Sequence, residues 1–290
     1  MKLVQEAIRK SAVLIEALPY IKAYSGKIVV IKYGGSALIN PEIKKRVLQD
    51  IVFMSYVGIR PVIVHGGGPF INEELKKLDI KVEFKDGLRV STKEVVSVVD
   101  KVLSRVNLDI VKDIKDLGGR AISLNTAKKD VIKATSHKNA SKLGFVGEVE
   151  EVYGDVIRKV IRPRSIPVIS PLGLGEDNEL YNVNADEVSC EVAIALKAAK
   201  LVLLTDVKGI MREKGNEDTL ISTLTVKEVK TLVEQNVIQS GMIPKVSSCI
   251  KALNGGVSKI HIIDGRIQHS LLLEIFTDKG IGTEIIKGKE

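Results

Sequence analysis

From Lys27 to the C-terminus, short runs of β-branched residues alternate with longer amphipathic stretches. This alternation is typical of parallel strands that are joined by crossover helices, so the sequence predicts an α/β fold. In the first half, we expect strands over residues 27–33, 60–65, 121–125 and 167–173. We expect helices over residues 41–57, 70–78 and 93–115, the first of which begins at Pro41.

The same alternation continues in the second half. The expected helices cover residues 184–199, 225–235, 242–254 and 269–276, and the expected strands cover 200–207, 258–264 and 282–287. Asp86 and Gly87 lie between two extended runs and predict a hairpin turn, and a second hairpin is predicted from Val131 to Val152. A cluster of Pro, Gly and acidic residues at 171–179 marks a soft boundary between the halves, across which one sheet is free to continue.

Ahead of this pattern, the first 18 residues carry a helical apolar stripe, formed by Leu3, Val4, Ala7, Ile8, Leu14, Ile15 and Leu18. The stripe predicts an amphipathic helix that ends before Pro19. An apolar stripe needs a surface to cover it. That surface is either the helix's own domain or the helix of a second copy in an oligomer.

The composition is that of a soluble, folded chain with one large or two ordinary domains. Of the 290 residues, 44% are apolar and 28% are charged, and no apolar run approaches the ~18 residues of a membrane span. Two distant cysteines outside any CxxC pair argue against a disulfide framework. The net charge is +8, but aromatic residues are 4%, Trp is absent and the lysines are spread out, so we expect no nucleic-acid partner.

Two glycine clusters follow predicted strands, Gly34 and Gly35 in KYGGSA and Gly66 to Gly68 in HGGGP. Glycine at the carboxyl end of a strand lets the backbone turn sharply and direct N–H groups at an oxyanion, where ligands bind in open α/β sheets. Such turns also occur for packing reasons alone. The presence of two glycine clusters on neighbouring strands favours ligand binding. The chain has no GxxxxGK[ST], complete GxGxxG, HExxH or Cys/His cluster, so we expect no P-loop, dinucleotide fingerprint or resident metal.

Three charged residues stand near these turns or at helix starts. Lys32 ends the first strand two residues before Gly34, and Lys245 lies near the start of the helix at 242–254. Asp186 lies in the first turn of the helix at 184–199. Each has an ordinary alternative, which is a solvated surface position for either lysine and N-capping for Asp186. We expect His65, between a strand and three glycines, to be structural rather than catalytic.

In chain order, KYGG, HGGGP, DGLRVST, GFVGEV, YNVNAD, LLTDVKGI, SGMIPKV and HIIDGR with LLLEIFTDKGIGT resemble motifs of the amino-acid kinase family, in particular its acetylglutamate kinase branch. The resemblance covers about residues 27 to 285. It implies an open αβα sandwich around a mainly parallel sheet, with an extra N-terminal helix. Residues 1–25 would be this oligomerisation helix, residues 26–172 the half that binds acetylglutamate and makes a dimer, and residues 173–290 the half that binds ATP.

The resemblance implies transfer of the γ-phosphoryl group of MgATP to the side-chain carboxylate of N-acetyl-L-glutamate, the second step of arginine biosynthesis. The Mg²⁺ would arrive with the nucleotide, without a metal site of the protein's own. Such a carboxylate has a pKa of about 4.3 and is ionised near neutrality, so the reaction needs no general base. It needs charge neutralisation and in-line positioning of two anions.

The resemblance also implies roles for individual residues. Lys32 and Lys245 would stabilise the transferred phosphoryl group from two sides, and Asp186 would hold both ammonium groups. Arg89 would hold the α-carboxylate of the substrate. The complete assignments are Gly34 and Gly35 for the phosphate loop, Gly67, Gly68, Arg89 and Asn182 for acetylglutamate, and Thr205, Asp206, Lys208, Gly209, Met211 and Gln239 for the nucleotide.

Arginine-inhibited members of the family resemble this chain in their N-terminal helix, which interlaces with a neighbour's helix and joins three dimers into a hexamer. The resemblance therefore implies a homohexamer with L-arginine as feedback effector, bound around Tyr20, His269, Glu274 and Gly280. A P-II signalling protein controls photosynthetic relatives, and the sequence leaves that partner open. We expect a cytoplasmic location, or the plastid stroma if an organelle encodes the chain.

The lysine-rich stretch from Thr126 to Leu143 departs from the family pattern and looks like a divergent hairpin over the substrate. Two alternatives to this function stay open. One is a kinase for another small acid, such as carbamate or aspartate. The other is a non-catalytic or nucleic-acid-binding protein built on the same scaffold.

Overall fold

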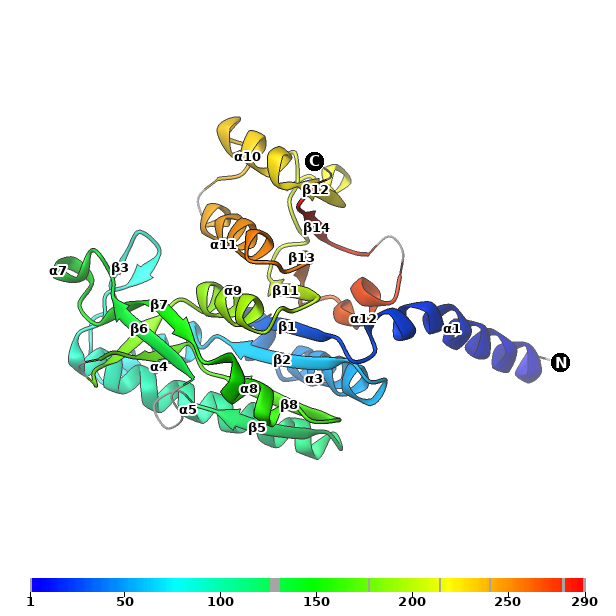
Figure 1. The fold of residues 1–290 in the computed structure, drawn as a ribbon, viewed down its shortest axis with the longest axis horizontal. Coiled ribbons are helices and arrows are strands. Elements are labelled where there is room, and N and C mark those ends of the chain that lie inside the picture. The colour runs from blue at the N-terminus through cyan, green and yellow to red at the C-terminus, as the bar shows by residue number, and fades with distance from the viewer. Residues whose placement is uncertain are drawn as a thin grey trace.

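The computed structural model describes residues 2–125, 131–176, 178–213, 215–239, 241–277 and 280–288. Within this part of the chain, an eight-stranded sheet forms the centre of the molecule (Figure 1). Its strands are β1 (Ile28–Tyr33), β2 (Arg60–His65), β5 (Arg120–Leu124), β8 (Ser165–Ile169), β11 (Lys200–Thr205), β12 (Thr223–Thr225), β13 (Lys259–Asp264) and β14 (Thr283–Ile286).

The strands follow the order β12-β14-β13-β11-β1-β2-β8-β5. Every neighbouring pair from β13 to β5 is parallel, while β14 runs antiparallel to β13 and pairs in parallel with the edge strand β12. The sheet therefore takes strands from both sequence halves and continues across the expected boundary. Strand β1 has one neighbour from each half of the sequence, β2 from the first half and β11 from the second.

Helices cover both faces of this sheet, which confirms the predicted open αβα sandwich. The helices are α1 (Lys2–Tyr24), α2 (Ser36–Ile39), α3 (Pro41–Tyr56), α4 (Gly68–Lys77), α5 (Lys93–Asp116), α7 (Ala140–Leu143), α8 (Gly154–Val160), α9 (Ala185–Ala195), α10 (Val226–Glu234), α11 (Met242–Asn254) and α12 (Ser270–Ile275), with a 3₁₀ turn at Glu217–Thr219.

The alternation of side chains along β1 explains the two layers. Val29, Ile31 and Tyr33 pack into the core under α3, α4, α5 and α12, whereas Val30 packs into the core under α8 to α11. Lys32, two residues after Val30, points to the same face as Val30. The side chain of Lys32 is thus directed toward α9 and α11.

A small second sheet closes into a barrel beside the main one. It consists of β6 (Ile132–Ser136), β7 (Val146–Val152), β9 (Leu172–Leu174) and β10 (Leu180–Val183). The predicted boundary at 171–179 includes β9 and ends just before β10, the strand that pairs with it. A hairpin of β3 (Phe84–Lys85) and β4 (Leu88–Arg89) turns at Asp86 and Gly87, as predicted. Both turn residues have positive φ, the backbone of a tight hairpin turn.

The N-terminal helix differs from its prediction, because α1 continues through Pro19 to Tyr24. Proline inside a helix removes the hydrogen bond to the residue four positions before it, here Ile15. Ile15 is 68% exposed, so water can satisfy its carbonyl, and the last turn is anchored where the Tyr24 ring covers Nζ of Lys200 at 4.7 Å. Figure 1 shows the helix extending away from the body of the molecule.

Other predicted elements are present with shifted ends. The strand expected at 167–173 divides into β8 and β9, since Pro171 between them has no N–H for a sheet ladder. The hairpin from Val131 to Val152 is confirmed as β6 and β7, with α7 inserted between them. Of the stretch 126–143, residues 126–130 lie outside the described residues, and the rest forms β6 and α7. In the described residues, no helix is long and apolar enough to cross a membrane.

Candidate active site

The two predicted glycine turns lie against each other at the carboxyl ends of β1 and β2. The N–H of Gly66 donates to the carbonyl of Tyr33 at 2.7 Å. A Cβ atom on Gly34 would lie 3.7 Å from the Cα of Gly66 and 3.3 Å from Nζ of Lys32, so the two backbones approach closely beside an ammonium group. Gly35 has a φ of +66°, a left-handed conformation that glycine adopts without strain.

Lys32, Asp186 and Lys245 meet beside these turns, although they are far apart in the sequence. Nζ of Lys32 lies 2.9 Å from Oδ1 of Asp186, and Nζ of Lys245 donates to Oδ2 of Asp186 at 2.6 Å. The three side chains come from β1, α9 and α11 and are only 13%, 12% and 23% exposed. The structure therefore brings these three predicted residues into one half-buried cluster with two positive charges and one negative charge.

Asp186 is available for this role because another residue caps its helix. Oδ1 of Asn184 accepts hydrogen bonds from the N–H groups of Asp186 and Glu187, so the alternative interpretation of Asp186 as an N-cap is wrong. Burial alone would raise the pKa of Asp186, but the charges and hydrogen bonds of the two lysines lower it to about 2. The carboxylate is thus fully ionised near neutrality.

His65 has a structural environment, in agreement with the sequence-based expectation. Its Nδ1 donates to the carbonyl of Gly66 at 2.9 Å, which leaves Nε2 as an acceptor for Ser170 or Asn107 at 3.1 and 3.2 Å. The side chain is fully buried, and this desolvation lowers the pKa of His65 to about 4, despite the opposing hydrogen bond to Gly66. A neutral imidazole therefore fixes the start of the second glycine turn.

This burial predicts a pH dependence of stability. Because the pKa of His65 is about 4 when folded and about 6.5 when unfolded, the unfolded chain binds the proton more readily. The stabilisation by neutral His65 is complete above pH 6.5 and is lost as the pH falls toward 4. This loss should lower the free energy of unfolding by roughly 2 kcal/mol between pH 7.5 and 5.0.

Urea unfolding of the wild type and of His65→Gln at both pH values measures this contribution. The wild type should lose about 2 kcal/mol more than His65→Gln over that interval. Equal losses in the two proteins would show that His65 becomes protonated in the folded state.

Arg89 and Asn182 lie in one hydrogen-bonded network at the hairpin and the barrel. Nδ2 of Asn182 donates to Oγ of Ser91 at 3.1 Å, and Ser91 donates to the carbonyl of Arg89 at 2.9 Å. Nη2 of Arg89 donates to Oδ1 of Asn72 at 2.5 Å and approaches the carbonyl of Gly68 at 3.4 Å. The structure thus connects Arg89 and Asn182 with the turn that carries Gly67 and Gly68.

Most of the residues expected at the nucleotide follow the carboxyl end of β11. Thr205 is buried and its hydroxyl accepts from the N–H of Val207, which closes the turn after the strand. Gly209 packs against Thr283, and Lys208 pairs with Glu217. Asp206 and Met211 lie in the same segment, while Gln239 precedes α11 and donates to the carbonyl of Asn236. Because β11 runs parallel to β1, with Leu203 paired to Lys32, the segment after β11 leaves the sheet at the same edge as the cluster.

Three of the four residues expected around an arginine effector line one pocket of about 220 Å³, namely Tyr20, Glu274 and Gly280. His269 is placed elsewhere, where its Nδ1 lies 2.6 Å from Oδ1 of the buried Asp50. The remaining titratable residues of this pocket, which the sequence did not indicate, are Lys200, Lys259, His261 and Glu284.

Strand register explains why these pocket residues were missed. Lys200 of β11 pairs with Lys259 of β13, and His261 pairs with Glu284 of β14. His261 also donates to Glu274 at 2.5 Å. Burial by itself would raise the pKa of Glu274, but this bond and two backbone N–H groups hold it below its usual range.

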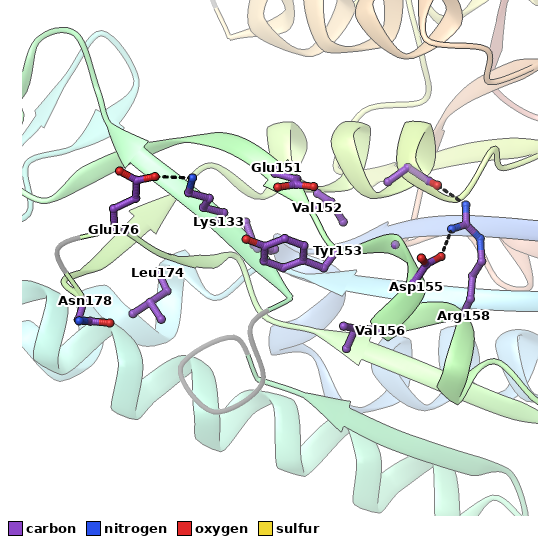
Figure 2. A pocket seen from close by; sticks show the side chains of 14 residues that line it. Lys133, Glu151, Val152, Tyr153, Asp155, Val156, Arg158, Leu174, Glu176 and Asn178 are labelled. Carbon is purple, nitrogen blue, oxygen red and sulfur yellow. Dashed lines mark hydrogen bonds and ion pairs between the residues drawn. The ribbon is translucent and has the colours of Figure 1, made fainter.

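A larger pocket of about 740 Å³ lies between the barrel and α8 (Figure 2). Four of its five charged lining residues are already paired, Lys133 with Glu176 and Arg158 with Asp155, and Lys133 also pairs with Glu150 outside the pocket. It contains none of the residues predicted for the site. In the described residues, no group of three or more His, Cys, Asp or Glu side chains is arranged to hold a metal ion.

Known proteins are similar to this chain in sequence and in fold. The family model described as "Amino acid kinase family" matches residues 27–264. Acetylglutamate kinase of Syntrophomonas wolfei is 48% identical over 98% of this chain and 99% of the relative, and that of Moorella thermoacetica is 50% identical over 97% and 98%. The N-acetylglutamate synthase of Neisseria gonorrhoeae, complexed with coenzyme A and N-acetyl-glutamate, superposes with a TM-score of 0.86 at 27% identity.

The synthase match covers 97% of this chain but only 64% of the synthase, so the chain spans less than two thirds of that protein. The two kinase relatives, in contrast, match over nearly the full length of both chains. The family model includes both glycine turns, Lys32, Asp186 and Lys245. The chain therefore belongs to the amino acid kinase family.

Proposed function

We propose that this chain transfers the γ-phosphoryl group of MgATP to the side-chain carboxylate of N-acetyl-L-glutamate and forms N-acetyl-L-glutamyl 5-phosphate, a step of arginine biosynthesis. The observation that carries the proposal is the cluster in which Lys32 and Lys245 share the carboxylate of Asp186. Relatives that are 48% and 50% identical over nearly their whole length and are named acetylglutamate kinase support the choice of substrate.

The electrostatics of the cluster suit a reaction between two anions. The acceptor carboxylate and the triphosphate repel each other, and the charge on the transferred group is spread over its oxygens in the transition state. Two ammonium groups beside a single carboxylate leave a net positive charge that neutralises part of this repulsion. Asp186 holds both lysines in place, and its low pKa keeps it charged near neutrality.

The glycine turns supply neutral donors on the same side of the sheet. The N-cap of α4 is Gly67, which has no side chain to cap the helix, so backbone N–H groups at its start stay available for an oxyanion. Gly34 and Gly35 would bind the transferred group, while Gly67 and Gly68 would bind the acceptor. Arg89 would hold the α-carboxylate and Asn182 the acetylamido or carboxyl region.

The magnesium ion belongs to the nucleotide substrate in this proposal. Both oxygens of Asp186 already face ammonium groups, which does not suit a carboxylate that ligates a cation. The triphosphate and water would therefore provide the ligands of the ion. The segment after β11, with Thr205, Asp206 and Gly209, would bind the nucleoside.

An assay of ADP formation with N-acetyl-L-glutamate, carbamate, L-aspartate and L-glutamate tests the proposal. We expect turnover with N-acetyl-L-glutamate and a hydroxamate when hydroxylamine traps the acyl phosphate. Turnover with carbamate or aspartate alone would assign the chain to another acid, and salt-sensitive DNA binding without ATP turnover would favour a non-catalytic function.

The pocket with Tyr20, Glu274 and Gly280 supports feedback inhibition by L-arginine, which carries a guanidinium, an ammonium and a carboxylate group. The pocket contains carboxylates of Glu274 and Glu284 and cations of Lys200 and Lys259. Lys259 and Glu284 pair at 2.8 Å, so a ligand with both signs of charge would share or replace that pair. Because Tyr20 belongs to α1, an arginine bound in this pocket would also contact the projecting helix.

We further propose that the exposed apolar residues of α1 pair with another copy in a hexamer. Val4, Ile8, Leu14, Ile15 and Leu18 are between 42% and 68% exposed, which costs solubility unless a partner covers them. Deletion of residues 1–18 should therefore yield dimers and raise the arginine concentration for half-inhibition by about tenfold or more.

Light scattering and inhibition curves of the deleted and full-length proteins check this prediction. Ala substitution of the exposed Glu16, which lies outside the apolar stripe of α1, serves as the matched control and should leave assembly unchanged. A deleted protein that still forms hexamers with unaltered inhibition would refute the role of α1.

A further inference from the structure

Arg89 is a buried cation whose partners in the described structure are neutral. Its side chain donates to the amide oxygen of Asn72 and to the carbonyl of Gly68, and Nη1 has no hydrogen-bond partner. The residue is 7% exposed, and burial lowers the pKa of Arg89. A buried guanidinium without a counter-charge is costly, so the position favours an anionic ligand.

Two residues determine which part of the guanidinium stays free. Phe84 is the cross-strand partner of Arg89 in the β3–β4 hairpin, and its ring lies 4.8 Å from Cζ of Arg89. Asn72 of α4 accepts from Nη2 at 2.5 Å. The ring covers one face of the group and the amide holds one end, which leaves Nη1 without a partner.

Phe84 contacts the guanidinium of Arg89 from outside the hydrophobic core. It is 52% exposed at the edge of a two-stranded hairpin, where a polar residue would cost less. Asn72 lies in α4, whose first turn contains the glycines proposed for the acceptor. The hairpin and the helix thus fix the guanidinium from two independent elements.

We propose that Asn72 and Phe84 are positioning residues that aim the free Nη1 of Arg89 at the α-carboxylate of an N-acylated amino acid. This inference rests on the proposed function and extends it to substrate specificity. An acceptor without an α-carboxylate would leave the buried guanidinium unpaired. Nη1 of Arg89 therefore selects acids that carry a second carboxylate on the carbon bound to the acylated nitrogen.

The test measures kcat and KM of Asn72→Ala and Phe84→Leu with two acceptors. One is N-acetyl-L-glutamate, and the other is 4-acetamidobutyrate, which has the same chain but no α-carboxylate. We expect Asn72→Ala to raise the KM for N-acetyl-L-glutamate about tenfold and Phe84→Leu a few-fold, with kcat and the KM for ATP within twofold. The affinity for 4-acetamidobutyrate, as substrate or as competitive inhibitor, should change less than twofold.

Matched controls come from the same elements. Glu73→Ala on α4 and Lys85→Ala on β3 remove exposed charges next to each positioning residue and should leave all constants unchanged. Phe84→Tyr keeps the ring over the guanidinium and should restore the wild-type KM.

The outcomes separate the inference from the proposed function. A wild type without turnover of N-acetyl-L-glutamate contradicts the proposed function itself. An active wild type whose variants keep the same KM, or lose equal affinity for both acceptors, overturns the role of Asn72 and Phe84.

Discussion

Replacing Lys245 or Lys32 by Ala should lower kcat by at least ~100-fold, about 2.7 kcal/mol of transition-state stabilisation, while the KM for each substrate changes much less. Each substitution removes one of two ammonium groups that lie 2.6 and 2.9 Å from Asp186. Under the proposed function, the charge matters most in the transition state, when the phosphoryl group would lie between the two lysines. A loss in kcat without a comparable rise in KM is therefore the expected signature.

The chain offers a close control for the Lys245 variant. Lys251 lies on the same helix and forms a 2.6 Å ion pair with Glu191 of α9, so it connects the same two helices as Lys245 and Asp186. It is 60% exposed, and Lys251→Ala should leave kcat unchanged. Steady-state kinetics of the three variants, with thermal unfolding to verify the fold, decide the question. Near-normal turnover of both Lys32→Ala and Lys245→Ala would remove the cluster from catalysis.

Replacing Arg89 by Ala should raise the KM for N-acetyl-L-glutamate by about 100-fold and leave the KM for ATP unchanged. The guanidinium is buried and Nη1 is free, so the substrate carboxylate would provide the missing partner. Arg89→Lys keeps the charge but loses the planar fork that Phe84 and Asn72 hold, so its KM should be intermediate.

Arg105→Ala is the control for this prediction. Arg105 pairs with Glu74 of α4, so the variant also removes a guanidinium contact of that helix, but on an exposed side. Its kinetic constants should match the wild type. An Arg89→Ala enzyme whose KM for the acceptor is unchanged would exclude Arg89 from the substrate site.

The sequence pattern predicts an α/β fold, whereas the family resemblance implies the αβα sandwich and the meeting of Lys32, Asp186 and Lys245. The β-branched run IVVIKY is typical of a buried parallel strand and the apolar stripe of α3 has the helix period, which local sequence is sufficient to show. The meeting of the three charged residues came from the family resemblance, because no spacing rule connects a strand end with two later helices. Asn184 caps α9, so Asp186 does not have to. Asn is a preferred N-cap residue, and its place two residues before Asp186 could have indicated this from the sequence.

The missed features depend on long-range packing. Past Pro19, α1 ends in a contact between Tyr24 and Lys200, which no local pattern reveals. The charged residues around Glu274 come together through the order of β11, β13 and β14, which the sequence does not specify. The support of Arg89 by Asn72 likewise joins a helix to a hairpin, and only the folded chain shows that the two are in contact.

In the proposed mechanism, two ammonium groups held by one aspartate stabilise the phosphoryl group during its transfer. A crystal structure with MgADP, aluminium fluoride and N-acetyl-L-glutamate tests it most directly, because the fluoride complex imitates the transferred group. We predict that Nζ of Lys32 and Nζ of Lys245 contact the fluoride from opposite sides, with Asp186 between the lysines and without a contact to the fluoride. A complex in which both lysines stay away from the fluoride, or in which the fluoride binds at another place, would contradict the claim.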